Sequence, residues 1–145
     1  MKITINESED IEDLEIVVNC KRVDENLLKM IAAIRAFDRK ITATRDGKLF
    51  VLDVDAIYYF ESVDKKTFIY LDKDVYESSL RLYELEEKFV NTDFFRASKS
   101  TIINLSKIKV ITPIFGGKLE VLLENNEKLV VSRQYVPLLK RKLNF

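Results

Sequence analysis

The sequence has no histidine and only one cysteine among its 145 residues. A Ser-His-Asp triad and a Cys-His pair both need histidine, and structural zinc sites need several cysteine or histidine ligands. The carboxylates show no spaced pair suited to acid–base catalysis. The Gly-Gly pair at 116–117 lacks the six-residue frame of a phosphate-binding loop and predicts a hairpin turn instead. We therefore predict a protein that is not an enzyme and that holds no metal, cofactor or small-molecule substrate.

Long apolar stretches are also absent from the chain. No segment approaches the roughly 20 apolar residues that a membrane-spanning helix needs. The first residues, MKITINESEDIEDLEI, are too acidic and too interrupted for a signal peptide. These features favour the reducing cytoplasm. Cys20 lies among strand-forming residues and is expected to be a buried, inert thiol, with a reactive thiolate beside Lys21 and Arg22 as the alternative.

Charge is distributed unevenly along a chain whose formal net charge is zero. Residues 1–40 carry 7 basic and 9 acidic side chains, residues 41–93 carry 7 and 12, and residues 94–145 carry 10 and 3. The last third is therefore basic, with a net charge of +7, while the rest is acidic. This asymmetry favours a polyanion-binding surface in the last third. The alternative is that the basic residues pair with the acidic middle of the chain.

Residues 1–40 predict a small α/β extension. Residues 2–6 and 13–21 are rich in strand-forming side chains and predict two short strands. An amphipathic helix is predicted over residues 24–37, with Asp24 as its N-cap. The apolar residues at helical spacing are Leu27, Leu28, Ile31, Ile34 and Phe37.

Residues 41–145 predict a mostly β domain, which assigns the chain to the α+β class. Asp46-Gly47 is a strong signal for a hairpin. A meander of three strands is expected within residues 56–78, followed by a short helix that Ser79 caps. Residues 94–99 are expected to form a loop. Further strands are predicted at 100–105, at 106–115 with Pro113 favouring an edge, at 118–123 and at 127–132, and a last helix at 132–145 with Pro137 in its first turn.

Three polar, basic turns suit the binding of phosphates or base edges. The first is expected to expose its side chains, and the third begins the last helix, where Ser132 is the expected N-cap and backbone N–H groups can meet a phosphate. If the turns cluster at one end of a sheet, they form an edge suited to DNA. The residues concerned are Lys65, Lys66 and Thr67 in the first turn, Arg96, Ser98, Lys99 and Ser100 in the second, and Arg133 in the third.

Residues 41–145 resemble a LytTR-type DNA-binding domain, the output module of many bacterial regulators. The segments that carry the resemblance are AIYYFESVDKKTFIYL, SLRLYELEEKF, FFRASKSTIINLSKI and KLVVSRQYVPLLKRKL. The family implies an elongated, mostly β fold built on antiparallel sheets, which inserts loops into successive major grooves of double-stranded DNA.

The resemblance also implies roles for single residues. Thr67, Lys99 and Arg133 stand at base-contacting positions, while Arg96, Ser98 and Ser100 lie where phosphate contacts are expected. Ser100 has the alternative of satisfying the loop backbone. Lysine has no acceptor, so Lys99 suits guanine or a phosphate and cannot accept from the amino group of adenine.

The function that follows is a cytoplasmic, sequence-specific transcription regulator that binds repeated DNA sites as a homodimer. The chain lacks the alternating strands and helices of a receiver domain, so a stand-alone regulator is expected. Residues 1–40 are the candidates for dimerisation, or for binding a membrane protein that restrains such regulators, unless their helix merely packs on its own domain. The rival hypothesis is a β-rich interaction module whose basic third docks on an acidic protein.

Overall fold

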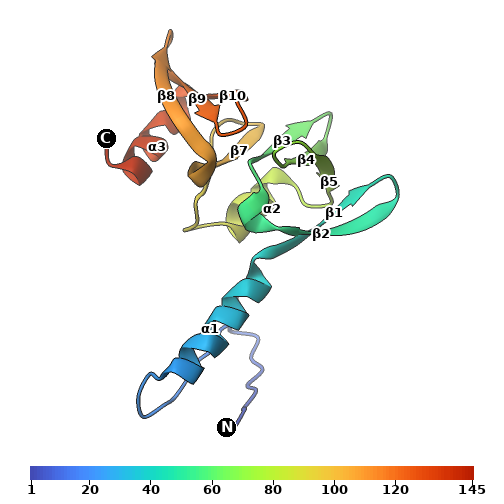
Figure 1. The fold of residues 1–145 in the computed structure, drawn as a ribbon, viewed down its shortest axis with the longest axis vertical. Helices are drawn as coiled ribbons and strands as arrows, with labels where there is room; N and C mark the ends of the chain where they lie inside the picture. Colours follow the sequence, from blue (N-terminus) through green and yellow to red (C-terminus); the bar gives the residue numbers. More distant parts are fainter. The chain divides into compact units, whose positions relative to one another are not determined.

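The computed structural model describes residues 1–35 and 39–145 with their side chains, and residues 36–38 by their backbone alone. The chain divides into two compact units, residues 1–35 and residues 36–145 (Figure 1). No helix in the described part is long and apolar enough to cross a membrane. Each unit is described by itself.

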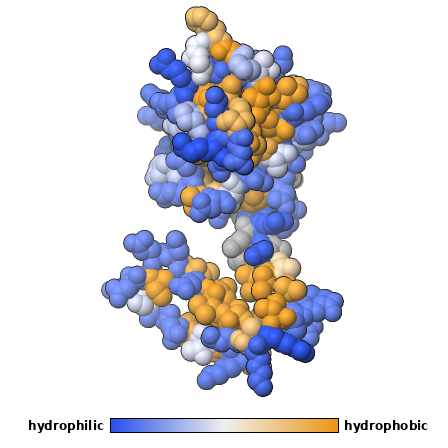
Figure 2. All heavy atoms as spheres, turned by 90° about the vertical axis from the view of Figure 1, so that its left-hand side faces the viewer, coloured by the Kyte–Doolittle hydropathy of each residue, from blue (hydrophilic) through white to orange (hydrophobic). Residues whose placement is uncertain are grey.

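The first unit contains no strand in its first 24 residues, so the prediction of strands at 2–6 and 13–21 is wrong. Their apolar side chains are exposed, Leu14 at 92% and Val17 at 69%. Strand backbone needs a neighbouring strand for its hydrogen bonds, and the described residues of this unit offer none. Cys20 is exposed as well, contrary to the predicted burial. Figure 2 shows hydrophobic side chains gathered on the visible surface of this unit.

The predicted helix is present as α1 (Glu25–Asp38). Its predicted N-cap is confirmed, because the carboxylate of Asp24 accepts a hydrogen bond of 2.8 Å from the N–H of Leu27. The half-buried face differs from the prediction, since Met30 belongs to it and Leu28 is 57% exposed. The side chain of Phe37 lies outside the described residues. The half-buried stripe consists of Leu27, Met30, Ile31 and Ile34.

Tight turns join the first strands of the second unit, as predicted. The hairpin of β1 (Lys40–Arg45) and β2 (Lys48–Asp53) turns at Asp46 and Gly47, which have φ of 53° and 74°. Positive φ at both central residues gives a type I′ turn, whose twist matches the flanking strands. The hairpin of β3 (Tyr59–Val63) and β4 (Lys66–Tyr70) turns in the same way at Asp64 and Lys65. A short 3-10 helix at Val54–Ala56 connects the two hairpins.

The main sheet has seven antiparallel strands in the order β2-β1-β5-β4-β3-β7-β6. β5 (Val75–Ser78) completes the predicted meander, and β7 (Thr101–Asn104) is the strand expected after the basic loop. β6 (Phe94–Arg96) corrects the prediction of a loop at 94–99. Three residues are too few to show an alternating pattern, and the strand exists because it pairs with β7.

A second, three-stranded sheet has the order β10-β9-β8. β8 (Ile108–Ile114) follows a 3-10 helix at Leu105–Lys107 and forms an edge, as its proline predicts. β9 (Lys118–Leu123) and β10 (Lys128–Val131) follow turns at the glycine pair and at Asn126. The chain ends in a 3-10 helix at Arg133–Tyr135 and in α3 (Val136–Leu143) with proline in its first turn.

The short helix α2 (Leu82–Lys88) has Arg81 at its N-cap, so the predicted cap at Ser79 is wrong. The carboxylate of Glu84 accepts from the N–H of Arg81 at 3.1 Å and so satisfies one of the donors that a helix start leaves free. The side chains predicted to share the apolar face are buried, as expected. They are Leu82, Leu85 and Phe89.

Two hydrophobic cores lie on opposite faces of the main sheet, because successive side chains of a strand point to opposite sides. Phe60, Phe94 and Ile102 face α2 in one core. Their chain neighbours face the second sheet and α3 in the other, where the buried residues include Tyr59, Phe95, Ile103, Val121, Leu123, Val131 and Leu139. The main sheet is therefore packed on both sides, which fixes the loops at its ends.

Candidate nucleic-acid interface

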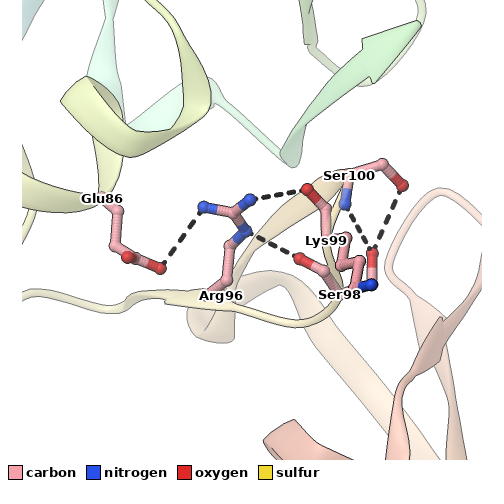
Figure 3. Close-up of polar contacts among 5 residues, drawn as sticks. All are labelled: Glu86, Arg96, Ser98, Lys99 and Ser100. Atoms are coloured by element: carbon pink, nitrogen blue, oxygen red, sulfur yellow. Dashed lines mark hydrogen bonds and ion pairs between the residues drawn. The ribbon is translucent and has the colours of Figure 1, made fainter.

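The loop between β6 and β7 is held by the side chain of Arg96 (Figure 3). Its Nε donates to the carbonyl of Ser98 at 2.7 Å, and its Nη2 donates to the carbonyl of Lys99 at 2.6 Å. Its Nη1 lies 3.6 Å from a carboxylate oxygen of Glu86 on α2, and only 17% of the side chain is exposed. Because its donors are turned toward the protein, Arg96 fits a role in shaping the loop better than the predicted phosphate contact.

The backbone of the same loop is tied at both ends. The carbonyl of Ser100 accepts from the N–H of Ser62 on β3, and the carbonyl of Ala97 accepts from the N–H of Ser132, both at 2.8 Å. Within the loop, the hydroxyl of Ser98 accepts from the N–H of Ser100 at 3.2 Å. The serine that satisfies the loop backbone is therefore Ser98, whereas the alternative considered from the sequence was Ser100. Lys99 remains exposed at the tip.

A surface hollow brings the second and third predicted turns together. Lys99 and Arg133 both line it, and both side chains are exposed. Three cations and no acidic residue line this hollow, which suits an anion or an acceptor-rich base edge. Ser132 stands at the N-cap of the 3-10 helix as predicted, but its side chain makes no capping hydrogen bond. The lining residues are Ser98, Lys99, Ser100, Gly116, Lys118, Ser132, Arg133 and Gln134.

A second hollow joins the β3–β4 hairpin to the same loop, since Thr67 and Lys99 both line it. Thr67 is only 3% exposed, so the prediction that the turn exposes this side chain is wrong. It lies inside β4, between strands on both sides. Lys65 and Lys66 are exposed as expected, and the carbonyl of Lys65 accepts from the guanidinium of Arg81 at 3.1 Å.

Sequence reasoning missed Arg81, Lys118 and Gln134, which also line these hollows. Lys118 follows the glycine pair that predicts a turn, so its exposure at a hairpin end was accessible from the sequence. Its closeness to Arg133 was not, because that depends on how the second sheet packs. Arg81 gave no signal beyond its charge.

Most basic residues of the last third form no ion pair with the acidic side chains that the structure describes. Among the described side chains, Arg96 is the one member of the ten basic residues in 94–145 that forms an ion pair. This observation argues against internal pairing with the acidic middle of the chain. The other ion pairs of the described residues are Arg39–Asp55, Lys40–Asp53 and Arg45–Asp74.

Burial raises the pKa of Tyr59 and Tyr70, which pack in the core beside the second sheet. The rings of Tyr59 and Tyr70 stack with centroids 4.2 Å apart. Burial raises the pKa of Tyr59 far above its usual value, and the nearby carboxylate of Glu127 raises it further. Burial and then Glu61 raise the pKa of Tyr70. Both hydroxyls therefore stay neutral at ordinary pH and contribute packing, not charge, to this part of the molecule.

The described part of the chain is mostly β and presents a basic surface, and comparison with known families assigns its class. The family model of the LytTr DNA-binding domain matches residues 47–144. The chain therefore belongs to the LytTR family, which is a family of DNA-binding domains and not of enzymes. A solved LytTr DNA-binding domain from Bacillus cereus superposes with a TM-score of 0.70 at 24% identity, covering 74% of this chain and 98% of that one. This confirms the predicted mostly β LytTR-like fold.

Among curated relatives, the sensory transduction protein LytT of Enterococcus faecalis is 33% identical over 98 residues, which are 68% of this chain and 40% of that protein. The transcriptional regulatory protein YpdB of Escherichia coli K12 is 32% identical over 77 residues, 53% of this chain and 32% of that one. The chain thus spans less than half the length of these relatives. An uncharacterized HTH-type transcriptional regulator of Staphylococcus aureus is 25% identical over 144 residues, which are 98% of this chain and 95% of that protein.

Proposed function

We propose that this protein is a cytoplasmic, stand-alone transcription regulator that binds repeated DNA sites as a homodimer and places its loops in the major groove. The observation that carries the proposal is the hollow lined by Lys99, Lys118 and Arg133 without any acidic residue. Membership of the LytTR family supports DNA as the ligand. The Staphylococcus aureus relative, which matches along almost its whole length, supports regulation by a chain of this size.

In the proposed mechanism, Arg133 contacts bases and the surrounding groups position the protein. Guanidinium binds O6 and N7 of guanine through two hydrogen bonds, the commonest specific contact in the major groove. Lys99 donates to guanine or to a phosphate, and the exposed Lys65, Lys66 and Ser100 contact phosphates, which fix register without carrying sequence information. Because Thr67 is buried in this conformation, we propose that it stabilises the hairpin and does not contact a base.

The decisive experiment measures binding of Arg133→Ala to duplexes selected from a random library by the wild-type protein. The loss of a two-hydrogen-bond contact should cost about 1–3 kcal/mol and relax the preference at one base pair. Lys73→Ala is a matched control, because Lys73 is exposed but lines neither hollow. Unchanged affinity and preference in Arg133→Ala would refute the assignment.

Salt dependence separates the proposal from the rival of an acidic protein partner. Each phosphate that the protein neutralises on duplex DNA contributes about −0.9 to the slope of log K against log salt. Two or three lysines on phosphates therefore give a slope of about −2 to −3. A shallow slope, or selection that enriches no sequence, would favour the interaction module.

A further inference from the structure

The turn between β8 and β9 carries an aromatic ring with no protein contact of note. Phe115 is 99% exposed, whereas Phe60, Phe89, Phe94 and Phe95 are buried. Single exposed apolar residues are common on protein surfaces, so exposure alone assigns nothing. Phe115 directly follows β8 and belongs to the turn of the β8–β9 hairpin, whose end projects from the second sheet (Figure 1).

This turn borders the hollow that holds the proposed base contact. Gly116 and Lys118 line the same hollow as Lys99 and Arg133. A Cβ atom on Gly117 would lie 3.1 Å from Cδ and 3.3 Å from Cγ of Arg133, so the backbone of the turn packs directly on the stem of that side chain. Any nucleic acid contacted by the guanidinium of Arg133 therefore comes close to the turn.

The chemistry of the turn suits DNA in two complementary ways. Lys118 is exposed and forms no ion pair among the described side chains, so its ammonium is available to a phosphate. Phe115 offers an apolar surface, and the C5-methyl group of thymine is the apolar group that base edges present in the major groove. Positive φ at Gly116 and Gly117, 86° and 73°, lets the backbone approach without side chains in between.

We propose that the β8–β9 turn is a fourth DNA-contacting element, in which Lys118 neutralises a backbone phosphate and Phe115 packs on a thymine methyl group beside the base pair contacted by Arg133. The inference rests on the proposed function and adds to it a preference for thymine. It also explains why an aromatic ring stands fully in solvent beside a cationic hollow.

Replacing thymine by deoxyuridine in the selected duplex tests the apolar contact, because this change removes only methyl groups. The wild-type protein should lose about fourfold in affinity for each methyl group that it buries. Phe115→Ala should bind the thymine duplex with a similar loss and show no further loss on the deoxyuridine duplex. Leu49→Ala is the control, since Leu49 is 69% exposed on β2 and lines neither hollow.

The outcomes separate this inference from the proposed function. If Arg133→Ala weakens binding while Phe115→Ala keeps the full response to methyl removal, the thymine contact is wrong and the DNA-binding proposal stands. If Phe115→Ala weakens both duplexes equally, the ring contacts sugar and the thymine assignment is overturned. If selection enriches no duplex, both proposals fall.

A salt titration tests the phosphate contact of Lys118 independently. Lys118→Gln should make the slope of log K against log salt shallower by about 0.9 on every duplex, whatever its sequence. Lys73→Gln, the control at the β4–β5 turn, should leave the slope unchanged. An unchanged slope in Lys118→Gln would show that Lys118 does not contact a phosphate.

Discussion

The guanidinium of Arg96 holds two carbonyl groups of its own loop and approaches Glu86 on α2. At the scale of single residues, Arg96 therefore shows that a basic residue in a DNA-binding loop can serve to hold the loop itself. The resemblance to LytTR domains implies a phosphate contact for Arg96, because it matches a position beside the proposed DNA-contacting loop. The sequence alone could not predict the inward direction of the side chain, because Glu86 and the two carbonyls meet only in the folded protein.

Replacing Arg96 by lysine distinguishes the two roles. A lysine keeps the charge but cannot span two carbonyls with a planar fork. If Arg96 braces the loop, Arg96→Lys and Arg96→Ala should both lower DNA affinity by about 1–2 kcal/mol, roughly tenfold in Kd. Fluorescence anisotropy with a labelled duplex measures this. Near-normal binding by Arg96→Lys alone would favour a phosphate contact instead.

At the scale of elements, local sequence signals predict the turns and helices well, whereas strands that depend on pairing with a distant strand are not predictable in this way. The turns at Asp46-Gly47 and Gly116-Gly117 follow from residues that accept positive φ, so the hairpins were accessible from the sequence. β6 is not predictable because three residues are too few to show an alternating pattern. The prediction of strands at 2–6 and 13–21 is wrong because a segment rich in strand-forming residues still needs a neighbouring strand to pair with. The clustering of the loops around Lys99 depends on packing between the sheets and gave no sequence signal.

Two glycines with nearly equal φ give a matched pair of variants. Gly47 has φ of +74° with nothing within 4 Å of an added Cβ, while Gly117 has φ of +73° and the stem of Arg133 at 3.1 Å. Gly47→Ala and Gly117→Ala should each lose about 1–2 kcal/mol of stability from the left-handed backbone, measured by urea unfolding. Gly117→Ala should also weaken DNA binding, because the added methyl group displaces Arg133. Equal DNA affinity in the two variants would contradict this coupling.

At the scale of the whole molecule, the two sheets meet at neutral tyrosines. Burial raises the pKa of Tyr59, so the folded protein keeps the hydroxyl protonated where the unfolded chain begins to ionise, near pH 10. Its contribution to stability is complete below that pH and is lost as the pH rises further.

Alkaline unfolding therefore tests the packing between the sheets. Above about pH 10, the free energy of unfolding should fall by up to about 1.4 kcal/mol per pH unit more in the wild type than in Tyr59→Phe. Urea titrations at pH 8 to 11 measure the difference. Tyr83→Phe serves as a control because Tyr83 is 62% exposed, and an identical pH dependence in Tyr59→Phe and wild type would contradict the burial argument.

We propose that residues 1–40, which include the first unit, mediate dimerisation or the binding of a partner protein. Exposed apolar side chains in an extended segment commonly mark an interaction surface. The double variant Leu14→Lys, Val17→Lys should shift sedimentation toward the monomer and reduce affinity for a duplex with two sites but not for one with a single site. Glu12→Lys, Glu15→Lys, in the same segment, is the control. If the Leu14→Lys, Val17→Lys variant remains a dimer, these side chains do not form the dimer interface.

A single backbone hydrogen bond, from the N–H of Ser132 to the carbonyl of Ala97, joins the loop of Lys99 to the start of the segment that carries Arg133. We therefore expect the two proposed contacts to be coupled, so that base changes at their two target positions are not additive in free energy. For a lineage acquiring a new operator, this means that altering one contact disturbs the other. Useful changes in specificity are then expected to arise as compensating pairs.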